Sequence, residues 1–128
     1  MGKFYSLLLM MLFYTLADFG GGWVSEGKSS TYTVHLTEVG NHIFGKYCFI
    51  TNNGNRIDCA KQDDDDNIAG DIFDRHAQIS FDSTFGGAGK AVLTPKEDNL
   101  IYHFTDKSPF VYANMSVPDE IVMKRFSK

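Results

Sequence analysis

The chain has 128 residues, of which 43% are hydrophobic and 22% are charged, and its formal net charge is −4. This is the size and composition of one globular domain, and it excludes a disordered chain. The negative charge argues against a general nucleic-acid binder, which would carry a basic surface. The 12 glycines, 11 phenylalanines and six tyrosines favour strands joined by tight turns.

Residues 1–17 have the pattern of a secretory signal peptide. Lys3 gives a positive start, residues 4–16 form an uncharged apolar stretch, and Ala17 precedes the expected cleavage site. The alternative is a membrane anchor, but spanning a bilayer takes about 20 apolar residues. We therefore expect residues 18–128 to form a single exported β-domain, periplasmic or secreted, with no membrane segment after cleavage. Loss of Lys3 would make this domain one charge unit more negative than the whole chain.

Apolar and polar residues alternate with a period of two after the leader, which is typical of half-buried strands. The expected strands are residues 31–39, 42–51, 56–60, 68–73, 77–81, 90–94, 100–105 and 120–126. The segment between Pro109 and Pro118 is expected to be looser, with room for a short edge strand. Short strands joined by tight turns predict an all-β fold. We expect an antiparallel meander of seven or eight strands, closed as a small barrel or a sandwich.

The two cysteines lie symmetrically about one expected hairpin turn. Cys48 is five residues before Asn53, and Cys59 is five residues after Gly54, so a turn centred there places them opposite each other. A two-residue loop would place the cysteines in a hydrogen-bonded pair, and a four-residue loop would place them in the closer non-hydrogen-bonded pair. Both Cα distances suit a disulfide, and we favour the four-residue loop, residues 52–55, because it gives the closer pair. Cysteines of exported proteins are usually bonded. The alternative is two free buried thiols.

An acidic run follows this hairpin: Asp63, Asp64, Asp65 and Asp66. Together with Asn67, this run partly matches a calcium-binding loop, but Ile68 stands where that loop needs glycine and no helical pattern flanks it. A solvated connecting loop is one interpretation, and an acidic patch that contacts a basic partner is another. We predict no metal and no cofactor.

Tyr47 and Phe49 place aromatic side chains on the second face of a strand whose first face carries Cys48. In the expected register Phe49 lies opposite Asp58. One interpretation is a strand covered on both faces. The other is an aromatic binding surface beside Asp58 and the acidic run, since exposed aromatics serve as anchors in protein interfaces.

Catalytic motifs give little support for an enzyme. The sequence has no nucleophile motif of the G-x-S-x-G type and no histidine pair at a metal-binding spacing. His35 and His103 lie on the polar sides of their strands. A hydrolase that uses these histidines is a weak alternative, because the sequence does not show that they converge.

Four segments resemble a family of small exported proteins of Gram-negative bacteria. They are GKYCFITNNGNRIDCA (45–60), IAGDI (68–72), AQISFDSTFGGAGKAVLT (77–94) and VPDEIVMK (117–124). The resemblance covers most of residues 30–125 and implies a small lipocalin-like or sandwich-like β-structure. Some small β-proteins of this kind act as immunity proteins or inhibitors beside secreted toxins or hydrolases. The resemblance assigns no functional residue, and the acidic run is not part of it.

The sequence therefore predicts an exported, non-enzymatic binding protein of the immunity or inhibitor type. Its partner is expected to be a basic toxin or enzyme, with no nucleic acid involved. The expected partner-binding residues are Tyr47, Phe49, Asp58, Asp63, Asp64, Asp65 and Asp66. The alternative is a small-molecule carrier with an apolar barrel interior. An interior filled by Trp23, Tyr32, Phe44, Phe81 and Phe104 would argue against a carrier.

Overall fold

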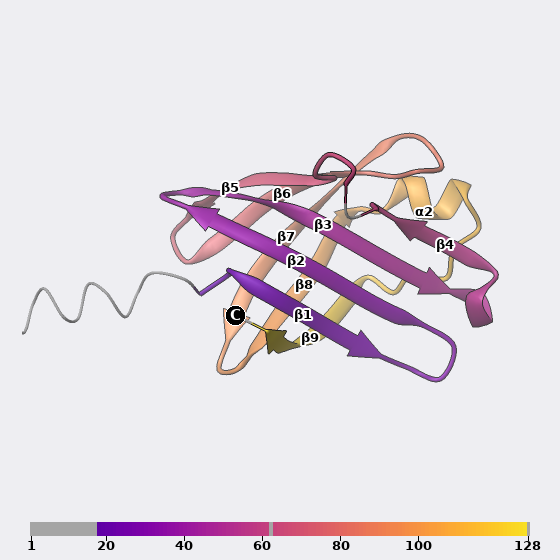
Figure 1. Ribbon diagram of the computed structural model, residues 1–128, viewed down its shortest axis with the longest axis horizontal. Helices are drawn as coiled ribbons and strands as arrows, with labels where there is room; N and C mark the ends of the chain where they lie inside the picture. The colour runs from indigo at the N-terminus through magenta and orange to yellow at the C-terminus, as the bar shows by residue number, and fades with distance from the viewer. Residues whose placement is uncertain (1–17, 62, 128) are drawn as a thin grey trace, which may run out of the picture.

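The computed structural model describes residues 18–61 and 63–127, so the expected leader lies outside the described residues (Figure 1). Within these ranges the chain forms nine strands, one short α-helix and one 3-10 turn. The strands are β1 (Gly21–Glu26), β2 (Thr31–Val39), β3 (His42–Thr51), β4 (Arg56–Cys59), β5 (Ile68–Phe73), β6 (His76–Asp82), β7 (Ala88–Lys96), β8 (Asn99–Asp106) and β9 (Glu120–Ser127). The turn is η1 (Asn52–Gly54) and the helix is α2 (Ser108–Tyr112).

Eight of the described strands close an antiparallel barrel in the order β2-β1-β9-β8-β7-β6-β5-β3, and β3 pairs again with β2. The ninth strand, β4, lies outside this closed circuit. It shares one edge of β3 with β5: β5 pairs with residues 42–45 of β3, and β4 pairs with residues 48–51. The expected all-β fold and antiparallel pairing are confirmed, and the closure is that of a barrel.

Aromatic rings fill the barrel interior. Phe49 of β3 contacts Tyr102 and Phe104 of β8, with ring centroids 6.0 and 6.2 Å apart. Phe110 of α2 enters from one end and stacks on Phe81 at 5.1 Å. The interior of an eight-stranded barrel is just wide enough for side chains to fill it. The fully buried large side chains are Trp23, Tyr47, Tyr102, Phe49, Phe81, Phe110, Ile43, Ile68, Leu93, Leu100, Met123 and Val34.

All eight expected strands are present, and two features differ from expectation. β1 was not expected, because its glycine-rich start has low strand propensity. It forms because it pairs with β2 on one side and with β9 on the other. The expected edge strand between Pro109 and Pro118 is wrong, because this segment holds α2. Pro109 lies in the first helical turn, where a missing backbone N–H costs nothing.

The hairpin register is as expected. Cys48 pairs with Cys59 across a four-residue loop, and a disulfide joins them with 3.9 Å between the two Cα atoms. Phe49 pairs with Asp58 and Ile50 with Ile57, also as expected. The disulfide therefore fixes β4 against β3.

Along β3 the buried residues are the odd-numbered ones, so Tyr47 and Phe49 face the interior and Cys48 faces outward. Phe44 also points to the outer side, where it is half-buried. The expected role of Phe44 in the barrel interior is therefore wrong. Among the described residues, no helix has the length and hydropathy needed to cross a membrane.

Candidate functional site

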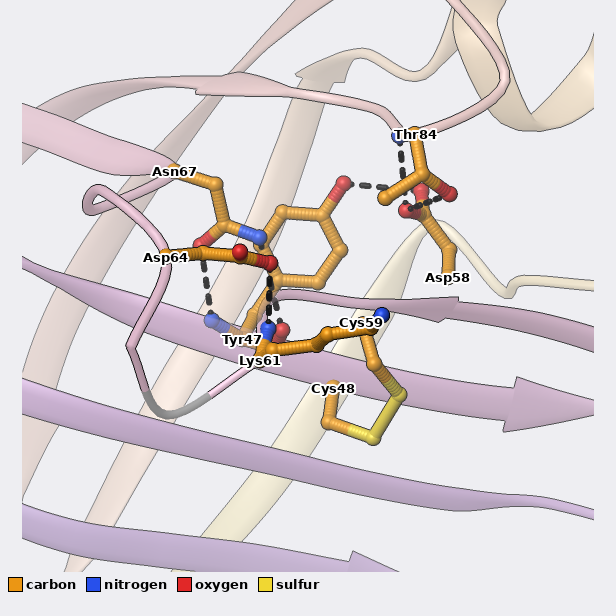
Figure 2. Close-up of a disulfide and its surroundings, with 8 residues drawn as sticks. All are labelled: Tyr47, Cys48, Asp58, Cys59, Lys61, Asp64, Asn67 and Thr84. Carbon is orange, nitrogen blue, oxygen red and sulfur yellow. Dashed lines mark hydrogen bonds between the residues drawn. A yellow bond between two sulfur atoms is a disulfide. The ribbon is translucent and has the colours of Figure 1, made fainter.

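A buried carboxylate, Asp58, connects β4 to the segment that follows β6. Asp58 is 0% exposed. Its Oδ2 accepts hydrogen bonds from the hydroxyls of Tyr47 and Ser83, each at 2.8 Å. Its Oδ1 accepts hydrogen bonds from the backbone N–H and the hydroxyl of Thr84, each at 2.9 Å (Figure 2). A buried carboxylate is tolerated when its oxygens accept several hydrogen bonds in this way.

These contacts place Asp58 in a structural position. Residues 83–87, named here the glycine turn, join β6 to β7, and positive backbone φ angles at Gly86 and Gly87 allow the turn to fold back. Asp58 holds the start of this turn against β4. Side-chain hydrogen bonds thus join β4 to the end of β6, where no strand ladder connects these two strands.

Asn67 closes the gap between β4 and β5 along the edge of β3. Its side-chain oxygen accepts a hydrogen bond from the Tyr47 backbone N–H at 2.9 Å, where neither strand supplies a partner. Its own backbone N–H donates to the Gly45 carbonyl at 3.0 Å, and its carbonyl accepts from the Asp82 N–H at 3.0 Å. Asn67 therefore fixes the end of the preceding loop to both β3 and β6.

That loop, residues 61–67, is named here the acid loop. Its four aspartates are exposed, as expected for a solvated loop or a contact patch. Asp64 accepts a hydrogen bond from the Lys61 backbone N–H at 2.8 Å, and Asp66 pairs with Lys46 at 2.8 Å. Asp63 and Asp65 make no hydrogen bond or ion pair with the described part of the chain. Their carboxylates are thus available to a partner.

The acid loop, the glycine turn and α2 lie next to one another at one end of the barrel, and we call these three segments the rim. The Asp82–Asn67 hydrogen bond links the acid loop to the turn. A Cβ built on Gly87 would contact Pro109 at 3.6 Å, so the turn adjoins α2. Figure 1 shows the three segments together beyond β4.

The rim exposes large apolar side chains beside its carboxylates. Phe85 of the glycine turn is 50% exposed, and Val111 and Tyr112 of α2 are 63% and 88% exposed. The adjacent Phe110 is completely buried, so the helix is fixed to the barrel while Val111 and Tyr112 face solvent. Exposed aromatics on a rigid support, next to charged groups, are the composition of a protein-binding surface.

The structure separates the expected binding residues into two groups. Asp63, Asp64, Asp65 and Asp66 are exposed on the rim. The expectation that Tyr47, Phe49 and Asp58 form an exposed surface is wrong, because all three are at most 1% exposed. The aromatics pack in the interior, and Asp58 accepts hydrogen bonds from Tyr47, Ser83 and Thr84. Their roles within the described residues are packing and polar closure.

Sequence reasoning missed Phe85, Val111 and Tyr112. Phe85 lies between the expected strands 77–81 and 90–94, and an aromatic at the tip of a turn has no core to enter. Val111 and Tyr112 lay in the looser segment. A helix of five residues is too short to show an apolar period, so no signal separated the buried Phe110 from its exposed neighbours.

The structure places His35 and His103 in different surroundings. His35 and His103 are exposed on the outside of the barrel, as expected, and lie on β2 and β8. His35 packs against the Phe126 ring, with centroids 5.3 Å apart, and His103 Nδ1 is 3.5 Å from Glu120. Among the described residues, no three histidine, cysteine or acidic side chains are grouped to hold a metal ion.

Two buried phenols make the stability sensitive to alkaline pH. Burial, reinforced by the charge of Asp58, raises the pKa of Tyr47 above its ordinary value of 10.0. Burial alone raises the pKa of Tyr102, whose hydroxyl has no hydrogen-bond partner among the described residues. Both phenols stay protonated in the fold and ionise near pH 10 once unfolded. Their stabilising contribution is therefore complete below pH ~10 and lost as the pH rises further.

We expect the free energy of unfolding to fall between pH ~9 and ~11 and expect Tyr102→Phe to reduce this fall. At neutral pH Tyr102→Phe should be neutral or slightly stabilising, because it removes an unpaired buried hydroxyl. Tyr47→Phe should cost about 1–2 kcal/mol, because it removes a hydrogen bond to a charged group. Urea unfolding of both variants across this pH range tests the prediction. An equal alkaline loss in Tyr102→Phe and the parent protein would contradict it.

Comparisons of the chain with protein-family models, with curated proteins and with solved structures find no match.

Proposed function

We propose that this chain is an exported, non-enzymatic binding protein of the immunity or inhibitor type. It acts by covering the surface of a basic toxin or enzyme with its rim. The observation that carries the proposal is the rim itself, which has exposed Phe85, Val111 and Tyr112 on two of its segments and four exposed aspartates on the third. In such a surface the carboxylates steer a basic partner and the aromatics supply the contact energy.

Export is part of this proposal. The disulfide is consistent with an oxidising compartment, where such bonds form and persist. The signal-peptide pattern of residues 1–17 and the resemblance to small exported proteins of Gram-negative bacteria support the same location. A periplasmic or secreted protein would meet its partner outside the cytoplasm.

The carrier alternative receives no support from the packing of the barrel. The rings of Phe49, Phe81, Tyr102, Phe104 and Phe110 occupy the interior, with neighbouring centroids 4.9–6.2 Å apart. A ligand of ordinary size needs a cavity of about 300 Å³ or more. The packing of these rings therefore favours binding at the surface over a ligand held among them in the barrel interior.

The experiment uses the protein encoded by the neighbouring gene as a candidate partner, because immunity proteins are normally encoded beside their toxins. Association is followed by surface plasmon resonance at two salt concentrations. The double variant Asp63→Lys/Asp65→Lys should slow association about tenfold or more and weaken its salt dependence. These two exposed residues make no hydrogen bond or ion pair within the described structure, so the fold should be unaffected.

Glu97→Lys/Asp98→Lys is the matched control. It makes the same charge change in the turn between β7 and β8, at the end of the barrel opposite the rim, and it should leave association nearly unchanged. Tyr112→Ala should weaken binding about tenfold or more through faster dissociation. If the partner binds but the rim and control variants behave alike, the rim is not the binding surface. If no basic partner binds, the proposed function is wrong.

A further inference from the structure

The attachment of β4 sets this strand apart from the rest of the described sheet. β4 pairs with four residues of β3 and forms no ladder with another strand. Ile57 points outward and is 54% exposed, so it contributes little burial. Asp58 is the β4 side chain that reaches the interior, and it does so through polar contacts. The Cys48–Cys59 disulfide is therefore a major part of what holds β4 in place.

β4 in turn positions the rim. The acid loop starts directly after β4, and the glycine turn is held through the contacts of Ser83 and Thr84 with Asp58. Arg56 of β4 donates a hydrogen bond from Nε to the Ala113 carbonyl at 3.0 Å, just after α2. All three segments of the rim thus have a contact that depends on β4.

We propose that the Cys48–Cys59 disulfide is a redox switch for the rim: when the disulfide is reduced, β4 detaches and the acid loop and the glycine turn lose their attachment, while the eight-stranded barrel stays folded and Phe110 keeps α2 in place. As regulation of a binding surface, this inference rests on the proposed function. The change in structure that it describes does not depend on a partner. Its consequence is that the rim is complete only after the chain has entered an oxidising compartment.

The position of the disulfide indicates that its reduction causes a local change rather than global unfolding. Both cysteines lie on the outer side of the barrel and are half-buried, so a reductant has access and loss of the bond leaves no hole in the aromatic interior. The closing pairs β2–β3, β3–β5 and β5–β6 include no residue of β4. Figure 2 shows the disulfide on one side of β4, with Asp58 and Thr84 on the other.

The redox step is a two-electron reduction. A dithiol such as dithiothreitol supplies two electrons and two protons, the Sγ–Sγ bond breaks, and a thiol forms on each cysteine. The dithiol is itself oxidised to a cyclic disulfide. Without the cross-link, β4 is held only by its short ladder and by the contacts of Arg56 and Asp58. These contacts must also offset the conformational entropy that is lost when the acid loop and the glycine turn become ordered.

Hydrogen–deuterium exchange of the purified protein, with and without dithiothreitol and in the absence of any partner, tests the inference. We expect amide exchange in residues 56–67 and 83–87 to accelerate at least tenfold on reduction. Exchange in β6, β7 and β8 should be unchanged in the same experiment. The double variant Cys48→Ser/Cys59→Ser should show the reduced pattern with or without dithiothreitol, which separates loss of the disulfide from other effects of the reductant.

Two results would overturn the switch: unchanged exchange in residues 56–67 after reduction, or loss of protection across all strands. Failure of the switch leaves the proposed function standing if the oxidised protein binds its partner through the rim. Conversely, the exchange pattern can appear as expected in a protein that binds no basic partner. The two proposals therefore fail separately.

Discussion

Asp58→Ala is expected to lower the free energy of unfolding by about 3 kcal/mol or more. The substitution removes both acceptor oxygens at once. It leaves the Ser83 hydroxyl and the Thr84 backbone N–H without their acceptor, and the Tyr47 hydroxyl keeps only the Asp82 carbonyl. A buried donor left unpaired costs about 1–3 kcal/mol. The loss should be largest in β4 and the glycine turn, which Asp58 joins. Equilibrium unfolding in urea measures the total change.

Two variants make this measurement specific. Asp58→Asn keeps the volume and one acceptor, and the hydroxyls around it are able to turn and accept from the new amide, so it should cost about half as much. Asp65→Ala removes an exposed carboxylate that makes no hydrogen bond or ion pair in the described structure, and it should stay within about 0.5 kcal/mol of the parent. If Asp58→Ala costs less than about 1 kcal/mol, the polar closure is unimportant for stability.

Phe110→Ala is expected to cost about 3–5 kcal/mol, the usual range for removing a buried phenylalanine ring. Phe110 is 0% exposed, stacks on Phe81 and contacts the rings of Phe49 and Phe104 edge-on or tilted. Without its ring, α2 keeps Pro109 as its buried side chain, because Val111 and Tyr112 are exposed. Thermal or urea unfolding measures the loss of stability.

Tyr112→Ala is the natural control for Phe110→Ala. It truncates an aromatic side chain of the same helix, two residues away, but Tyr112 is 88% exposed. Its effect on stability should stay within about 0.5 kcal/mol. Similar losses in the two variants would show that α2 does not enter the barrel through Phe110.

The sequence predicted the fold class because the signal for it is local. Alternation along residues 31–39 and 77–81 defines strands with one apolar face, and the cysteine positions about the Asn53–Gly54 turn fixed one register. Closure into a barrel was left open, because alternation does not distinguish a barrel from a sandwich. Closure depends on β1, which was not recognised as a strand because of its glycine-rich start. It also depends on the offset between neighbouring strands.

The sequence could not assign the faces of β3. Phe44, Cys48 and Ile50 on one face and Tyr47 and Phe49 on the other are all apolar, so the pattern does not say which face is inside. In the structure Asp58 lies opposite Phe49 and on the same face of the sheet, and this is the face that is buried. A carboxylate next to buried aromatics was interpreted as a surface feature. Its burial is tolerable because Tyr47, Ser83 and Thr84 donate hydrogen bonds to it, and the contacts with residues 83 and 84 are long-range in sequence.

The two fixed ends of the acid loop have a consequence for protein engineering. The loop begins beside a covalent cross-link at Cys59 and ends at Asn67, which is hydrogen-bonded to two strands. Since the cost of closing a loop rises only slowly with its length, foreign peptides inserted between these anchors should not disturb the barrel. The protein is in this respect a scaffold for displaying loops. We expect the same two anchors to accept other loop sequences in place of the natural acidic segment.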